Sequence, residues 1–149
     1  MSLRLVPHIH RATHRIGLYL AHLREDGLSQ GEAHILALLA SSGPATIAEL
    51  HRGLAHKRST LTSILDRLAA RGFITREVGA TDRRTFVVTP TGKGASIARR
   101  VHRHLLDLEE AVGRRVTADD VKSFMKVVSA VEDEAHRRTA ERKNRKVFS

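Results

Sequence analysis

Apolar residues in the first part of the chain recur with the spacing of one face of a helix. Steps of three and four residues separate Ile9, Ala12, Ile16, Leu20 and Leu23. A run of this kind buries one side of a helix and leaves the other side in water. The period therefore predicts a helix that starts at Ile9 and ends near Gly27.

Three shorter helices follow, and the first two begin at capping boxes. The helices are predicted over 33–40, 46–50 and 57–70. The capping boxes are Ser29 with Glu32 and Thr46 with Glu49. In each of them a hydroxyl and a carboxylate satisfy backbone amides at the start of the helix. The third helix ends at a glycine cap, Gly72, and its inner face carries Leu61, Ile64, Leu65 and Leu68.

The periodicity then changes to that of strands. Phe73–Thr75 and Thr85–Thr89 are rich in strand-forming residues, and the polar loop between them predicts a hairpin longer than the two-residue kind. A helix is predicted to start at Pro90, because proline suits the first helical position, where its missing N–H is not needed. Its apolar stripe is Ile97, Val101, Leu105, Leu108 and Val112. The last helix opens with Thr117 and Asp120, and its stripe is Val121, Phe124, Met125, Val128 and Val131.

These elements predict a mainly α fold with a small antiparallel β-hairpin. Three short helices and a hairpin with a charged loop form a winged helix-turn-helix, in which the loop Val78–Arg84 is the wing. Helices that serve dimerisation flank it on both sides. The expected division is an N-terminal helix in 1–28, the winged domain in 29–93, C-terminal helices in 94–140 and a basic tail in 141–149. The tail has no apolar stripe, so we expect it to be disordered when free.

The distribution of charge adds an anionic partner to this picture. The chain has 149 residues, with 26 Lys and Arg against 16 Asp and Glu, and a net charge of +10. Residues 54–93 hold eight basic and three acidic side chains, and residues 137–149 hold six and one. Each segment therefore carries +5, and the rest of the chain is neutral. A basic excess confined to the winged domain and the tail indicates nucleic acid.

Composition excludes several other classes of protein. Without cysteine the chain has no disulfide framework, no Cys-based zinc module and no thiol chemistry. The longest apolar run, Ile35–Ala40, has six residues, whereas roughly 20 are needed to span a bilayer. No secretory signal is visible, and no Ser-His-Asp or paired-carboxylate arrangement indicates catalysis. We therefore expect a cytoplasmic protein that is not an enzyme, needs no cofactor and binds no membrane.

The third short helix carries the side chains that reading DNA requires. A helix in the major groove meets phosphates and base edges with short hydroxyls and long cations near its N-terminal half. The candidates are His56, Lys57, Arg58, Ser59, Thr60, Thr62, Ser63 and Arg67, together with Arg76 in the hairpin. On the wing, Arg83 and Arg84 are candidates for the minor groove. Phosphate would repel Asp82, so we expect its carboxylate to hold an arginine by a charge-assisted hydrogen bond.

Two segments resemble the MarR family of bacterial transcriptional regulators. They are RSTLTSILDRLAARGFITR at 58–76 and DRRTFVVTPTG at 82–92, and the likeness extends loosely over nearly the whole chain. The resemblance implies a ligand-responsive regulator, expected to be a repressor, that binds a pseudo-palindromic operator on double-stranded DNA. It also makes one of Arg83 and Arg84 the reader of the minor groove and the other the partner of Asp82.

The apolar stripes of the first helix and the last two helices predict a homodimer. They offer more apolar surface than a small winged domain covers. The residues expected at the interface are Ile9, Ile16, Leu20, Val101, Leu105, Leu108, Val112, Phe124 and Val128. A twofold dimer presents two recognition helices to half-sites about one helical turn apart. The alternative is that the stripes form an intramolecular core, which predicts a monomer.

Members of this family bind small, often aromatic acids between the DNA-binding lobe and the dimer helices. The corresponding region is a candidate effector pocket for a small anionic or aromatic ligand, formed by His10, His14, Arg15, Tyr19 and His34. His10 and His14 lie four residues apart on one helix face, a spacing that also suits metal chelation. Polar surface or pocket lining is the favoured interpretation of these histidines, and no metal site is predicted.

Two alternatives to a sequence-specific regulator stay open. The basic tail suits a second DNA anchor, a nonspecific RNA-binding arm or a solvated end, so an architectural or RNA-binding protein is one rival. A winged-helix module that uses its hairpin for protein contacts is the other. Salt-dependent binding to duplex DNA that depends on the wing distinguishes a sequence-specific regulator from both rivals. The first rival would bind nucleic acid through its tail, and the second would use its hairpin to bind protein.

Overall fold

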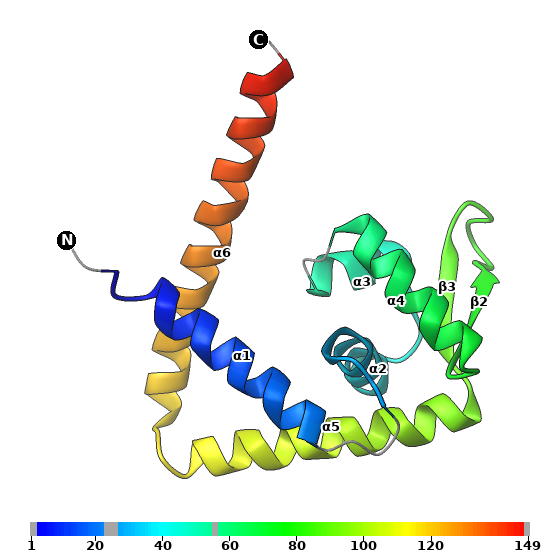
Figure 1. Ribbon diagram of the computed structural model, residues 1–149, viewed down its shortest axis with the longest axis horizontal. Coiled ribbons are helices and arrows are strands. Elements are labelled where there is room, and N and C mark those ends of the chain that lie inside the picture. Colours follow the sequence, from blue (N-terminus) through cyan, green and yellow to red (C-terminus); the bar gives the residue numbers. More distant parts are fainter. Residues whose placement is uncertain (1–2, 23–26, 55–56, 148–149) are drawn as a thin grey trace. The chain divides into compact units, whose positions relative to one another are not determined.

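The computed structural model describes residues 3–22, 27–54 and 57–147, with side chains as far as residue 143. The elements, drawn in Figure 1, are α1 (Val6–His22), α2 (Gln30–Ser42), β1 (Ala45–Thr46), α3 (Ile47–Leu54), α4 (Arg58–Ala70), β2 (Ile74–Val78), β3 (Phe86–Pro90), α5 (Gly92–Gly113) and α6 (Ala118–Val147). The chain divides into two compact units, Met1–Leu105 and Leu106–Ser149, which are described separately. Within the described residues, no helix is both long and apolar enough to cross a membrane.

The three strands form one antiparallel sheet in the order β1-β3-β2. β2 and β3 make the predicted hairpin, in which Val78 lies opposite Phe86. The sequence did not predict β1, whose two residues, Ala45 and Thr46, pair with β3. A strand of two residues is too short to produce an alternating pattern, so only its position beside β3 reveals it.

Helices α2, α3 and α4 and the sheet supply most of the core of Met1–Leu105. The largest fully buried side chains are Phe73, Ile35, Leu36, Leu50, Leu61, Leu65, Leu68 and Val88. All four residues predicted for the inner face of α4 are buried, so its polar side faces outward. Both capping boxes are confirmed. The hydroxyls of Ser29 and Thr46 accept the N–H groups of Glu32 and Glu49, whose carboxylates accept the N–H groups of Ser29 and Thr46.

Pro90 ends β3 and does not begin a helix, which corrects the prediction made for it. α5 starts two residues later and is capped by Thr91, whose hydroxyl oxygen accepts the Gly94 N–H at 3.0 Å. The same hydroxyl donates to the Gly72 carbonyl at 2.6 Å, which ties the start of α5 to the turn after α4. Proline is tolerated at this end of the strand because β1 reaches no further along β3 than Val88, so no bond to β1 is lost.

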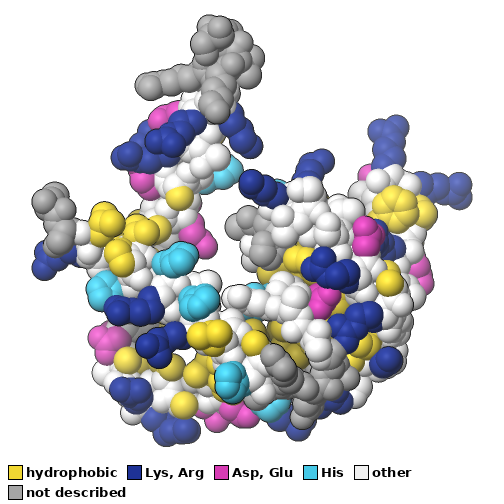
Figure 2. Space-filling model, in the orientation of Figure 1, with side chains coloured by type: hydrophobic (Ala, Val, Ile, Leu, Met, Phe, Trp, Pro, Cys, Tyr) yellow, Lys and Arg dark blue, Asp and Glu magenta, His cyan; other side chains and the backbone are white. Residues whose placement is uncertain are grey.

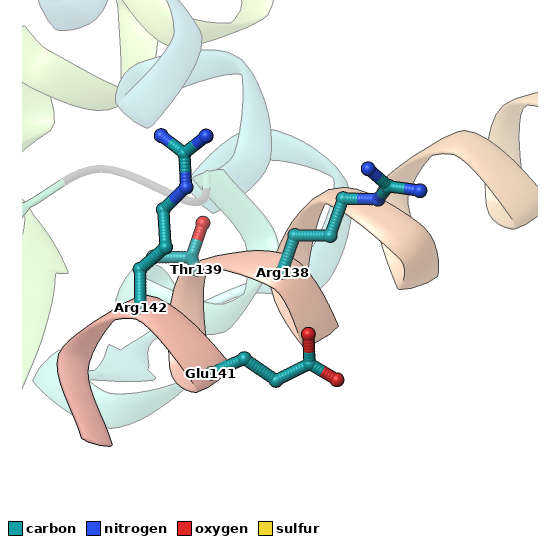
Figure 3. Close-up of a pocket in the computed structure, with 4 residues that line it drawn as sticks. All are labelled: Arg138, Thr139, Glu141 and Arg142. Carbon is teal, nitrogen blue, oxygen red and sulfur yellow. The ribbon is translucent and has the colours of Figure 1, made fainter. Parts of the chain in front are cut away.

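α6 continues through the basic tail to Val147, so the expectation of a disordered tail is wrong. Glu134 accepts hydrogen bonds from Arg137 and Arg138, which hold its pKa at about 2, and Arg137 also pairs with Glu141. Ion pairs three and four residues apart stabilise this C-terminal part of α6, which continues beyond the apolar stripe that ends at Val131. Figure 3 shows the residues that line a pocket on this helix, Arg138, Thr139, Glu141 and Arg142.

Candidate nucleic-acid interface

The outer side of α4 carries most of the residues predicted to read DNA. Those that the structure describes as exposed are Lys57, Arg58, Ser59, Thr60, Thr62, Ser63 and Arg67. Thr62 and Ser63 donate their hydroxyls to the carbonyls of Arg58 and Ser59, at 2.9 and 3.0 Å. Their oxygens keep lone pairs that can accept from a base or a bound water. His56 lies outside the described residues, so its contact stays a prediction.

The first turn of α4 suits an anion. Lys57 stands at the N-cap, where its side chain makes no capping hydrogen bond. The first backbone N–H groups of a helix have no partner within the helix, and the helix dipole places partial positive charge at the same end. Lys57 and Arg58 add two full charges there. A phosphate at this position would therefore meet both amide donors and cations.

A groove of about 550 Å³ opens between α3, the start of α4 and the wing. We call it the basic groove, and it is lined by Thr46, Ile47, Ala48, His51, Arg52, Arg58, Leu61, Thr62, Arg84, Thr85 and Phe86. Its three arginines come from α3, α4 and the wing loop, and none of its lining residues is acidic. Cationic side chains that line a concave surface focus a positive potential there, so the basic groove attracts a polyanion.

Sequence reasoning missed part of the basic groove. His51 and Arg52 lie on α3, which the sequence predicts only as a short helix with a capping box, and Phe86 enters the sequence prediction only as a strand-forming residue. Two adjacent basic residues at the end of a short helix were an available indication for α3. Nothing in the sequence places the wing beside that helix, because the placement depends on the pairing of β1 with β3.

The tip of the wing is a tight turn organised by Asp82. Its carboxylate accepts the backbone N–H of Arg84 at 2.9 Å, and its carbonyl accepts the Thr85 hydroxyl at 2.8 Å. This corrects the predicted contact, because Asp82 holds the backbone of Arg84 and not a guanidinium. Arg83 and Arg84 are both exposed, and of the two only Arg84 lines the basic groove. Figure 2 shows Lys and Arg side chains extending outward at the wing.

Arg67 has a partner inside the winged domain, the carboxylate of Glu32. Arg67 Nε lies 3.0 Å from Glu32 Oε1, and Arg71 Nη1 lies 3.6 Å from Glu32 Oε2. Burial raises the pKa of Glu32, but hydrogen bonds from the Ser29 N–H and Arg67 and the charges of both arginines outweigh it, so the pKa lies below its ordinary value. These ion pairs join the start of α2 to the end of α4 and so hold the two helices together.

Arg76 also has an intramolecular partner, the Asp66 carboxylate on α4. Its side chain is 29% exposed, and its Nε is buried with no hydrogen-bond partner among the described residues. A guanidinium in this position links β2 to α4 through the ion pair with Asp66 and does not extend away from the protein to meet DNA. Since Arg67 and Arg76 both have such structural partners, we leave them out of the interface that we propose below.

The candidate effector residues lie on α1 and α2. Those exposed on α1 are His10, His14 and Arg15. Tyr19 donates its hydroxyl to the His104 carbonyl at 3.3 Å, and His34 is half-buried on α2. The basic groove is lined by other residues, so the effector pocket stays a prediction. Across the described ranges, no three or more His, Cys, Asp or Glu side chains come together in a group that could hold a metal ion.

The predicted dimer residues fall into two groups. Leu20 is buried and Val101 packs against the core, so both already have partners within Met1–Leu105. The exposed ones are Ile16, Val112 and Phe124, at 37%, 49% and 58%. The half-buried ones are Ile9, Leu105, Leu108 and Val128. Part of the predicted set is therefore explained by the single chain, and part is left in contact with water.

The chain is similar in sequence to known transcriptional regulators. Residues 28–86 match the model of the MarR family. The multiple antibiotic resistance protein MarR of Salmonella typhimurium is 34% identical over 91 residues, which cover 60% of this chain and 63% of that protein. The uncharacterized HTH-type transcriptional regulator YwhA of Bacillus subtilis is 27% identical over 95 residues, which cover 64% of this chain and 68% of that protein.

A solved structure extends the likeness beyond the matched segment. A MarR variant from Escherichia coli, crystallised with operator DNA, has a TM-score of 0.66 and 26% identity and covers 86% of this chain and 91% of that one. The segment matched by the family model begins just before α2 and ends at the first residue of β3, so it contains α3, α4 and the wing. Over this winged helix-turn-helix segment, the chain matches the MarR family in sequence and in fold.

Proposed function

We propose that this protein is a transcriptional regulator that binds double-stranded DNA through α4 and the wing, under the control of a small anionic effector. The observation that carries the proposal is the basic groove. Arg52, Arg58 and Arg84 reach it from three different elements, and no acidic side chain lines it. The E. coli MarR variant solved with operator DNA supports this role, since it shares the fold at 26% identity. A bacterial regulator of this kind acts in the cytoplasm.

Each part of this surface suits a different part of a duplex. The first turn of α4, with Lys57 and Arg58, meets phosphate at the edge of the major groove. Hydroxyls on the outer side of α4, such as those of Thr60 and Thr62, meet base edges there. Arg84, held by Asp82 through its backbone, enters the minor groove, where the negative potential is strongest over narrow A·T runs.

A salt titration with duplex DNA tests the proposal directly. The probe is a duplex enriched by the protein from a random-sequence pool, and a scrambled duplex of the same composition is the control. Each phosphate contact releases counterions and adds about −0.9 to the slope of log K against log salt. We expect a slope of several units and a preference of at least about 10³ for the enriched duplex. Absence of duplex binding, or binding that is independent of salt, would contradict the proposal.

We also propose that the chain acts as a homodimer through the exposed apolar residues of α5 and α6. Val112 and Phe124 are 49% and 58% exposed, and Val121 and Met125 are exposed beside Phe124. Phe124→Asp should therefore shift the sedimenting mass from dimer to monomer at micromolar concentration, because a carboxylate in an apolar interface is desolvated without a partner. Ser123→Asp is the control, since it makes the same charge change at an exposed polar position of the same helix. A wild-type protein that sediments as a monomer would refute the dimer.

A further inference from the structure

An exposed apolar pair at the base of the wing is not accounted for by ionic contacts with DNA. Val78 and Phe86 face each other across β2 and β3 and are 53% and 50% exposed. Side chains alternate along a strand, so this pair lies on the same side of the sheet as Ile74 and Val88. Those two residues are 3% and 0% exposed. The core therefore covers Ile74 and Val88 on this side of the hairpin and leaves Val78 and Phe86, which lie nearest the wing tip, in water.

The environment of Phe86 indicates what covers it. Phe86 lines the basic groove together with Arg58 and Arg84, which approach from α4 and the wing. A purely apolar partner would bury these guanidinium groups without counterions, which is costly, and a cationic partner would be repelled. The occupant must offer anionic groups and apolar surface side by side. Duplex DNA does so, because deoxyribose rings and thymine methyl groups lie between its phosphates.

We infer that Phe86 contacts duplex DNA directly, through a deoxyribose ring or a thymine methyl group beside the phosphate that Arg58 meets at the edge of the major groove. The inference rests on the function proposed above and adds a non-ionic determinant of affinity to it. Burial of the exposed half of the ring removes apolar surface from water, and this gain does not depend on counterion release. Phe86 therefore contributes to affinity equally at low and at high salt.

The test compares Phe86→Ala with Phe86→Leu on the enriched duplex over a range of salt concentrations. Phe86→Ala should weaken binding about tenfold, as expected for the loss of a buried aromatic side chain, with the salt slope unchanged. Phe86→Leu should keep most of the affinity, because it keeps apolar surface. Val78→Ala is the matched control, since Val78 is equally exposed and lies opposite Phe86 but is not a lining residue of the groove. It should change the affinity less than twofold.

Each outcome decides a separate question. If wild-type protein fails to bind the duplex, the proposed function fails, whereas normal binding by Phe86→Ala overturns this inference alone. A lower salt slope for Phe86→Ala also overturns it, because the ring would then act by positioning Arg84. Replacing thymine by deoxyuridine in the duplex identifies the group contacted. A smaller effect of Phe86→Ala on that duplex assigns the contact to a methyl group, and an unchanged effect assigns it to deoxyribose.

Discussion

Replacing Arg84 with alanine should weaken binding to the enriched duplex by about 30-fold and reduce the magnitude of its salt slope by about 0.9. An arginine contact in a DNA groove contributes roughly 1–3 kcal/mol, and the loss of one cation that displaces counterions from the phosphates accounts for that change in slope. The Arg84 backbone is held by Asp82 at 2.9 Å, so its side chain is presented from an ordered turn. Titrations at several salt concentrations measure both quantities.

Arg83→Ala is the matched control for this prediction. It removes the neighbouring cation from the same turn, but Arg83 does not belong to the lining of the basic groove. We expect about a threefold loss of affinity, since only the general attraction between the wing and DNA decreases. Equal losses for the two variants would contradict the assignment of Arg84 as the residue that enters the minor groove.

Replacing Gly94 with alanine should lower the free energy of unfolding by at least about 3 kcal/mol, since overpacking against rigid atoms is among the costly substitutions. A Cβ at Gly94 would lie 1.7 Å from the Phe73 carbonyl oxygen and 2.6 Å from its carbon. Both atoms belong to the backbone, so no side chain can rotate away to relieve the overlap. Denaturant unfolding followed by circular dichroism measures the loss.

Gly92→Ala controls for the general effect of removing a glycine from the first turn of α5. No heavy atom lies within 4 Å of a Cβ at Gly92, and its φ is not in the left-handed region. The substitution should be neutral or stabilising by up to about 1 kcal/mol, because alanine restricts the unfolded chain. A similar loss of stability in both variants would show that the close approach of Gly94 to Phe73 is not the cause.

Local features of the winged domain could be predicted from the sequence because they depend on neighbouring residues. The capping boxes at Ser29 and Thr46 and the apolar face of α4 involve side chains three or four positions apart. Such contacts form within one or two helical turns, whatever the rest of the chain does. The exposed row of hydroxyls and cations on α4 follows from the same periodicity, so residue spacing alone indicates the main candidate for DNA contact.

Features that depend on contacts between distant segments could not be predicted. Arg67 and Arg76 belong to the same basic segment as Arg58 and Arg84 and are indistinguishable from them by charge. Only the packing of α2 and β2 against α4 gives Arg67 and Arg76 carboxylate partners. Periodicity also cannot distinguish an apolar stripe that packs on the core of its own chain, as at Leu20, from one that is left exposed, as at Phe124.

The sequence by itself determined the order of the helices and of the two hairpin strands, the family resemblance and the two basic segments, because each follows from residue type and short-range spacing. Only the tertiary structure decided which of the cations pair with acids and which line the basic groove. It pairs Arg67 and Arg76 with acids and places Arg52, Arg58 and Arg84 around one groove with Phe86 at its side. The physical reason is that an ion pair or a groove depends on distance in space, which sequence separation does not specify.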